Sequence, residues 1–299
     1  MERADGVRVL AIMVVRDEAD IVEETLTAAA SWADRIFVLD NGSEDGTFDI
    51  LRAVAARHPD RIAVDRDARL FTDGIRATVY AAHRHEARPG DWWCRLDADE
   101  FVVGDPREVL ARVPAAFNRV VGSQFKFYLT RDDASAYAAD PKAWLQRPVR
   151  DRVRWYRNDW AEIRFARHRR LMRWVDTGWP SGTPRVFPER VPFRHYQYRS
   201  PAQIERRLRV RAQSIEWTHE SAWTGSDGGL FITPATGEPD WYSRLAPTSL
   251  LDYDDGESPL VARPQLLPEI RPPRGGVYAA LDGVLSLTGI RSIIASRRA

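Results

Sequence analysis

The 299-residue chain lacks the features that mark secreted, membrane-spanning and nucleic-acid-binding proteins. It has a single cysteine, Cys94, so no disulfide can form within the chain. Its 44 basic and 43 acidic residues leave a net charge of +1, which gives no argument for binding nucleic acid. No apolar run reaches the roughly 18 residues of a membrane span, and the N-terminus lacks a signal-peptide pattern. We therefore expect a cytoplasmic protein with no transmembrane segment and no nucleic-acid partner.

Short apolar segments alternate with amphipathic ones in the first third of the chain. The β-branched run at residues 7–15 has the pattern of a strand buried on both faces of a parallel sheet. Further strands are predicted at residues 35–40, 61–65 and 92–96, and helices at 19–32, 48–57 and 71–87. This alternation predicts right-handed βαβ units, and so an α/β fold whose mainly parallel sheet is flanked by helices.

Two aspartates, Asp97 and Asp99, follow the predicted strand at 92–96. Residues i and i+2 of an extended chain point to the same side, so both carboxylates can face one point past the strand's end. Paired carboxylates suit Mg²⁺ or Mn²⁺, which take further ligands from substrate phosphates. Acidic pairs are also common in solvated loops. The position at the carboxyl end of a strand favours a metal–diphosphate site.

Asp40 and Asp45 border a turn-rich segment after the second strand. One interpretation is that Asp45 caps the following helix and Asp40 closes a turn. The other is that Asp40, held at the carboxyl end of a strand, hydrogen-bonds the base or ribose of a nucleotide.

Three segments together resemble the successive signatures of family 2 glycosyltransferases with the GT-A fold. They are residues 9–16, the Leu-Asp-Asn-Gly-Ser-Glu-Asp-Gly-Thr segment at 39–47, and residues 90–100, which include Asp-Ala-Asp-Glu. The resemblance implies a GT-A-like, Rossmann-related domain over residues 1–220. Residues 221–299, where the resemblance ends, are expected to form an irregular C-terminal extension.

The resemblance also implies a site for a nucleotide-diphosphate-sugar donor. The nucleoside would be held by Val15, Arg16, Glu18 and Asp40, and the divalent metal and ribose by Asp97 and Asp99. Arg76 is placed near the base or diphosphate, with Arg69 and Arg84 as competing candidates.

The middle of the chain is expected to build the acceptor side. Residues 119–130 alternate as a strand does, and residues 140–159 show no clear period and are predicted to form a loop. The arginine-rich run at 164–174 is either a solvated face or a source of cations for a diphosphate or an anionic acceptor. Its residues 170–173 are similar to an Arg-Leu-Phe-Arg element of one branch of the family.

An inverting transfer needs a carboxylate that takes the proton of the acceptor hydroxyl. The branch carries its base in a His-Glu or Glu-Asp dipeptide downstream of the Arg-Leu-Phe-Arg element, and this sequence has neither there. Asp176 is the nearest in placement and Glu189 the alternative, whereas a turn role for Asp176 stays open.

Two further residues are candidates on the acceptor side. His195, in a segment that resembles the His-Tyr element of the branch, is a packed residue, a ligand that completes the metal shell, or a contact to the diphosphate. Trp179, among glycine and proline neighbours, is a candidate stacking platform for the acceptor sugar. A helix is predicted from Ser200, as its N-cap, to about residue 219.

The end of the chain is expected to be largely irregular. Residues 225–273 are rich in glycine, proline, aspartate and serine, and residues 277–296 recover helical periodicity. That amphipathic helix either packs on the core, lies on an anionic membrane surface, or pairs with a second subunit.

We therefore expect a metal-dependent enzyme, using Mn²⁺ or Mg²⁺, that moves a hexosyl or related sugar from a nucleotide-diphosphate donor to a hydroxyl acceptor, with inversion. The acceptor could be a glycan, a lipid-linked molecule or a small molecule. One alternative is a sugar-phosphate nucleotidyltransferase, although no glycine-rich phosphate loop follows the first strand. Another is a catalytically inactive protein that keeps the fold for binding or as a scaffold.

Overall fold

The computed structural model describes residues 6–72, 74–175, 178–183 and 185–212, and three short strands at 231–232, 240–243 and 251–252. Asp176 and the helix predicted at 277–296 lie outside these residues. No helix in the described part of the chain is long and apolar enough to cross a membrane.

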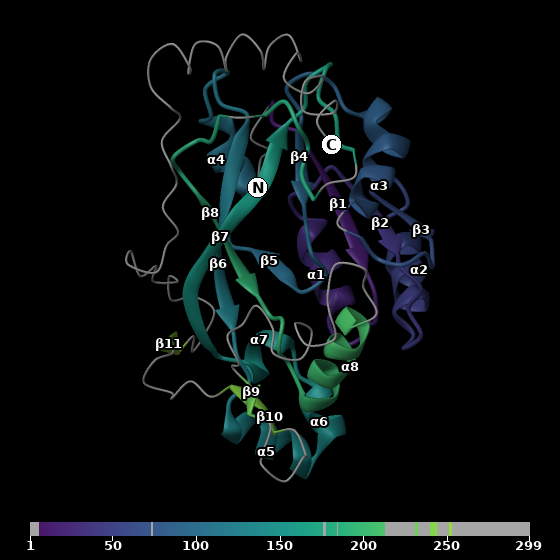
Figure 1. Ribbon diagram of the computed structural model, residues 1–299, viewed down its shortest axis with the longest axis vertical. Helices are drawn as coiled ribbons and strands as arrows, with labels where there is room; N and C mark the ends of the chain where they lie inside the picture. Colours follow the sequence, from purple (N-terminus) through teal and green to yellow (C-terminus); the bar gives the residue numbers. More distant parts are fainter. Residues whose placement is uncertain are drawn as a thin grey trace.

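Four parallel strands form one half of the central sheet (Figure 1). Their order across the sheet is β3 (Ile62–Arg66), β2 (Arg35–Asp40), β1 (Val9–Val15) and β4 (Trp92–Arg95). All seven residues of β1 are buried, as expected for a strand covered on both faces. The predicted strands and their parallel pairing are confirmed here.

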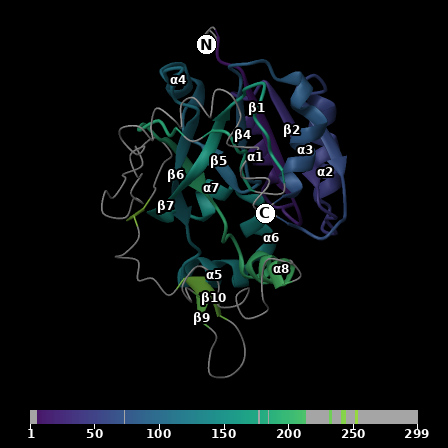
Figure 2. The same ribbon diagram turned by 45° about the horizontal axis from the view of Figure 1, so that its top comes forward.

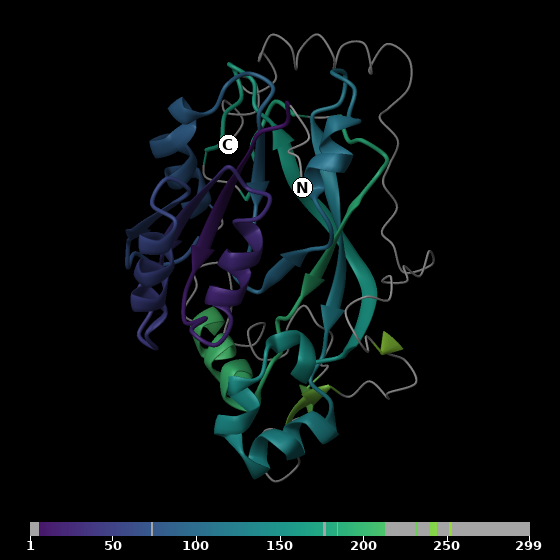
Figure 3. The same ribbon diagram turned by 180° about the vertical axis from the view of Figure 1, so that it is seen from behind.

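The helices of the first half cover both faces of these strands. Val9, Ala11 and Met13 of β1 pack in one cluster with residues of α1 (Val22–Ala29) and α2 (Thr47–Arg57). The alternate residues, Leu10 and Ile12, pack with α3 (Ile75–His83), which a 3₁₀ turn, η1 (Arg84–Glu86), continues. Figure 3 shows α1 on the near face of the sheet. The period-two alternation of a strand explains why one apolar run serves two cores.

The other half of the sheet mixes the two strand directions (Figure 2). Beyond β4 the order is β7 (Trp155–Arg167), β6 (Arg119–Phe127), β8 (Val191–His195) and β5 (Glu100–Val102). β7 is antiparallel to both β4 and β6, β6 is parallel to β8, and β5 is antiparallel to β8. A short helix, α4 (Pro106–Ala111), follows β5 with Asp105 as its N-cap. Because β5 begins five residues after the end of β4, it starts beside the carboxyl end of that parallel strand, and it pairs there with β8.

The prediction of a loop at residues 140–159 is wrong. The chain there forms α6 (Pro141–Gln146), α7 (Val149–Arg152) and the start of β7, after α5 (Arg131–Ala139). Side-chain caps at Thr130 and Asp140 begin α5 and α6, and Trp144 anchors α6 in the core. Helices of four to nine residues are too short to show a clear hydrophobic period, so the sequence pattern missed them.

The last helix among the described residues is α8 (Pro201–Ala212). As predicted, it begins at Ser200, whose Oγ accepts a hydrogen bond from the Gln203 N–H at 3.2 Å. The Gln203 Oε1 accepts from the Arg199 N–H at 3.1 Å. Residues 213–219 of the predicted helix lie outside the described residues. In the extension, β9 (Phe231–Ile232) pairs with β10 (Asp240–Ser243), and β11 (Leu251–Asp252) pairs with β7.

Candidate functional site

The candidate site lies where the loops after β1, β2 and β4 meet. Val15 and Asp40, the last residues of β1 and β2, stand opposite each other in the sheet register. The Glu18 N–H donates to Thr47 Oγ1 at 2.8 Å, and the Asp17 N–H donates to Ser43 Oγ at 3.0 Å. The β1 and β2 loops are thus fastened to each other. Carboxyl ends of parallel strands are the usual ligand-binding edge of such sheets.

Asp40 is fully buried and closes the turn after β2. Its Oδ1 accepts from the N–H groups of Gly42 at 3.2 Å and Ser43 at 3.1 Å, and Arg66 lies 3.3 Å away. Its Oδ2 is buried and has no hydrogen-bond partner among the described residues. One oxygen of Asp40 therefore closes the turn, and the other is left as an acceptor for a ligand.

Asp97 lies among three arginines. Arg76 of α3 donates to Oδ1 at 2.6 Å, and Arg164 of β7 donates to Oδ2 at 3.1 Å. Arg95 Nε lies 3.9 Å from Oδ1. Burial by itself would raise the pKa of Asp97, but these cations outweigh it and hold the pKa well below its ordinary value. Asp97 is therefore ionised at neutral pH.

Of the three arginines considered for the donor site, the structure brings Arg76 to the acidic pair. Arg69 instead pairs with Asp67 at the surface, and Arg84 lies over the ring of Tyr80.

Three carboxylates that could hold a metal ion, Asp97, Glu100 and Glu162, have oxygens within 4.8 Å of one another. A guanidinium already lies among them, because Arg164 donates to Asp97 and to Glu100 and lies 2.5 Å from Glu162. Arg164 is fully buried. Gln124 Nε2 also donates to Glu100, at 2.5 Å. Arg164 is thus the internal counterion of this triad.

Sequence reasoning missed Glu100 and Glu162, and it named Arg164 only as part of a basic run. The pattern Glu162-Ile163-Arg164 puts an acid and a base on the same face of β7, which is the one signal that pointed to the pairing. Farther along the same run, Arg167 stacks over the ring of Trp92 and His168 accepts from the Trp93 indole N–H.

Asp99 faces His195 across the β5–β8 pair. The imidazole Nε2 lies 3.3 Å from Asp99 Oδ1, and its Nδ1 lies 3.8 Å from Glu100 Oε1. Arg207 of α8 approaches the other oxygen, Oδ2, at 3.3 Å. Burial would raise the pKa of Asp99, but His195 and Arg207 outweigh it and lower the pKa. The structure therefore brings together Asp99 and His195, as a shared metal site requires.

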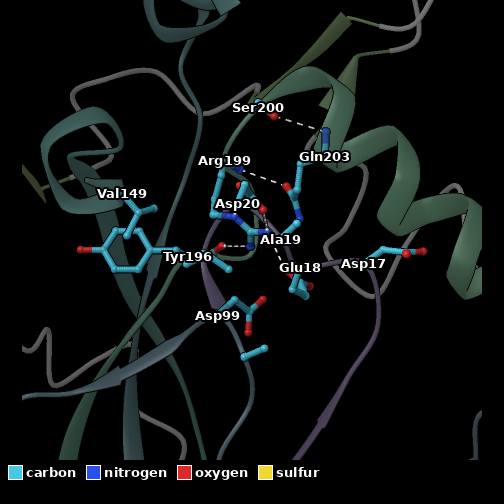
Figure 4. Close-up of polar contacts among 12 residues, drawn as sticks. Asp17, Glu18, Ala19, Asp20, Asp99, Val149, Tyr196, Arg199, Ser200 and Gln203 are labelled. Atoms are coloured by element: carbon cyan, nitrogen blue, oxygen red, sulfur yellow. Dashed lines mark hydrogen bonds and ion pairs between the residues drawn. The ribbon is translucent and has the colours of Figure 1, made fainter. Parts of the chain in front are cut away.

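A buried arginine ties the β1 loop to the start of α8 (Figure 4). Arg199 donates to Asp20 from Nε at 2.9 Å and from Nη2 at 2.7 Å, and it also pairs with Glu18. Burial raises the pKa of Glu18 to about 7, because it outweighs the attraction of Arg199 and because Asp99 repels the charged form. The predicted donor residue Glu18 thus stands beside the acidic pair.

Trp179 and Glu189 occupy different places relative to the site. The guanidinium carbon of Arg95 lies 4.9 Å from the centre of the Trp179 ring, which places Trp179 at the Asp97 cluster. Glu189 is exposed and pairs with Arg112. It precedes β8, whose far end carries His195, and six residues of extended chain span roughly 20 Å. The structure therefore does not bring Glu189 to the acidic pair.

The Asp99–His195 pair fits a divalent cation better than the triad does. A carboxylate oxygen and an imidazole nitrogen face each other there, 3.3 Å apart, and both atom types are ligands of divalent cations. In the triad, a fully buried guanidinium would have to leave first.

The chain is similar in part to several solved structures. GalNAc-T7, solved with UDP, GalNAc and Mn²⁺, is 14% identical over 42% of this chain and 24% of that chain, with a TM-score of 0.34. S. aureus TarS is 15% identical over 39% of this chain and 21% of that chain, with a TM-score of 0.30. For TarS 1–349 the identity is 10%, the coverages are 72% and 68%, and the TM-score is 0.35. This chain spans about a quarter or less of the first two proteins.

The family model described as glycosyl transferase family 2 matches residues 10–173, which is more than half of the chain. The matched segment runs from β1 past the end of β7 and includes Asp40, Asp97, Asp99 and Arg164. TM-scores below 0.5 describe partial likeness, so the assignment rests on this sequence match. The chain belongs to glycosyl transferase family 2.

Proposed function

We propose that this protein is a metal-dependent glycosyltransferase that moves a hexosyl or related sugar from a nucleotide-diphosphate donor to a hydroxyl acceptor, with inversion. One observation carries the proposal, in addition to family membership. Asp97 and Asp99, bordered by Arg76, Arg95 and His195, lie at the carboxyl ends of parallel strands, where such sheets bind ligands.

The donor's nucleoside is assigned to the loops after β1 and β2. The spare Oδ2 of Asp40 is an acceptor for an N–H group of the base, and the backbone after Val15, including Arg16 and Glu18, forms the adjoining wall. Arg76 and Arg95 supply positive charge beside Asp97 for the diphosphate. Asp97, kept ionised by these arginines, is an acceptor for the ribose hydroxyls.

Asp99 and His195 would hold Mn²⁺ or Mg²⁺, because together they offer an oxygen and a nitrogen donor in a buried setting. A metal bound there stabilises negative charge on the departing diphosphate.

The acceptor side is assigned to Trp179, whose indole lies next to Arg95 and offers a stacking face for a sugar ring. In the transfer, the acceptor oxygen forms a bond to the anomeric carbon as the bond from that carbon to the diphosphate breaks. Asp176 is our proposed base for the hydroxyl proton, since Glu189 pairs with Arg112 away from the acidic pair. A single displacement of this kind inverts the configuration at the anomeric carbon.

A thermal-shift titration with a panel of nucleoside diphosphates and sugar nucleotides, with and without Mn²⁺, tests donor binding. A ligand at 100 times its Kd adds about 2.7 kcal/mol to the free energy of unfolding. We expect one nucleotide to stabilise the wild type only with Mn²⁺, and Asp99→Asn to lose this effect. Asp60→Asn, a change in an exposed aspartate that precedes β3, serves as the matched control and should behave as the wild type. If no nucleotide stabilises the wild type, the proposal is wrong.

A further inference from the structure

We propose that Arg207 on α8 competes with the divalent cation for Asp99, so that cation binding loosens the hold of α8 on the donor site. This rests on the proposed function in one respect, that a divalent cation binds at Asp99. Neither the family match, which ends at residue 173, nor the sequence pattern assigns a role to Arg207.

The two oxygens of Asp99 face different cations. Oδ1 lies 3.3 Å from His195 Nε2, and Oδ2 lies 3.3 Å from Arg207 Nη1. The Asp99 side chain is only 4% exposed, so its charge has little help from water. Arg207 Nη1 also lies 3.9 Å from Glu18 Oε1. One guanidinium thus neutralises the second oxygen of the carboxylate whose first oxygen faces His195 and the proposed metal position.

A metal and Arg207 cannot both stay close to Asp99 without repelling each other. Like charges a few ångströms apart repel strongly where water is excluded. Arg207 is the member of the cluster that can leave, because its side chain is 19% exposed, whereas that of Arg199 is fully buried. Cation binding therefore displaces Arg207 rather than Arg199.

Displacement of Arg207 removes one arginine contact between α8 and the strand-end loops, and the described residues show two others at or just before the helix. Arg199, just before the helix, pairs with Asp20, and Arg206 pairs with Asp45 at 2.8 Å. Figure 4 shows α8 (green) beside the β1 loop, with Arg199 between them. The helix stays anchored at its start when Arg207 is released, while its contact with Asp99 is lost. The structure thereby couples the cation to the position of α8.

Manganese binding in the absence of nucleotide tests the competition. Free Mn²⁺ is counted by electron paramagnetic resonance during titration of wild type, Arg207→Gln and Arg206→Gln. Removal of a competing cation should tighten Mn²⁺ binding by Arg207→Gln about tenfold, equivalent to about 1.4 kcal/mol. Arg206→Gln, which removes the neighbouring charge and its pair with Asp45, should bind as the wild type does. In an Asp99→Asn background the difference between Arg207→Gln and wild type should vanish.

If Arg207 only supports the fold, its replacement should leave the affinity for Mn²⁺ unchanged or lower it. If Arg207→Gln binds Mn²⁺ as weakly as the wild type or more weakly, or if neither binds it, the proposal is overturned. Hydrogen exchange of residues 201–212 gives a second readout. Mn²⁺ should speed exchange there in the wild type and leave it unchanged in Arg207→Gln. If nucleotides stabilise the wild type but Arg207→Gln does not bind Mn²⁺ more tightly, this inference alone is refuted. If the wild type binds no nucleotide, the proposed function is refuted.

Discussion

Replacing Arg164 by methionine should destabilise the fold by about 3–5 kcal/mol, the cost of removing one partner of a buried ion pair. Arg164 is fully buried and bonds to Asp97, Glu100 and Glu162, whose oxygens lie within 4.8 Å of one another. Methionine keeps much of the side-chain volume but leaves the three carboxylates with no guanidinium at their centre. Burial already raises the pKa of Glu100 well above its ordinary value, and loss of Arg164 raises it further.

Urea unfolding at pH 7 measures the effect. Arg112→Met is the matched control, because Arg112 forms an exposed pair with Glu189 and its loss should cost less than about 1 kcal/mol. Mn²⁺ should restore part of the stability of Arg164→Met, since the vacated triad then offers three carboxylates to a cation. A loss for Arg164→Met no larger than that of Arg112→Met would refute the counterion role.

Three further changes test other parts of the structure. Gly122→Ala would place a Cβ 2.5 Å from Arg164 Cγ and 2.9 Å from the Phe193 ring, so calorimetry should show a loss of about 1–3 kcal/mol, and no loss would contradict the packing. Burial raises the pKa of Glu18 to about 7 in the folded state, above its ordinary value of 4.5, so the stability contributed by its protonated form is lost as pH rises to 7. Glu18→Gln should flatten this fall in unfolding free energy between pH 5 and pH 7, and an unchanged slope would contradict the raised pKa. Trp179→Ala should raise the KM for the acceptor about tenfold, in line with the loss of one aromatic contact, and leave the KM for the donor unchanged. Equal effects on the two KM values would contradict the assignment of Trp179 to the acceptor side.

Local patterns were sufficient to predict the parallel half of the sheet. The strands β1, β2 and β4 are apolar runs bounded by turn residues, and such runs carry their own signal. Asp40 and Asp97 were placed correctly at strand ends because the end of an apolar run can be read from the sequence itself. The capped start of α8 at Ser200 was equally local.

The counterions could not be predicted from local patterns. Arg164 meets Asp97 across 67 residues, and Arg207 meets Asp99 across 108, because β7 and α8 return to the sheet from distant parts of the chain. From the sequence alone, each of these arginines is expected to be a solvated surface charge. The position of Glu189 was also a matter of topology, since β8 runs away from it toward His195.

The most direct test of the proposed function is to identify which bond of the sugar nucleotide is broken. Purified protein is incubated with Mn²⁺, each sugar nucleotide of a panel and candidate hydroxyl acceptors or water, and the products are identified by nuclear magnetic resonance. We expect cleavage between sugar and diphosphate, release of a nucleoside diphosphate, an inverted anomeric centre, and loss of the reaction in Asp99→Asn. Cleavage within the diphosphate, or turnover that survives Asp99→Asn, would contradict the proposed function.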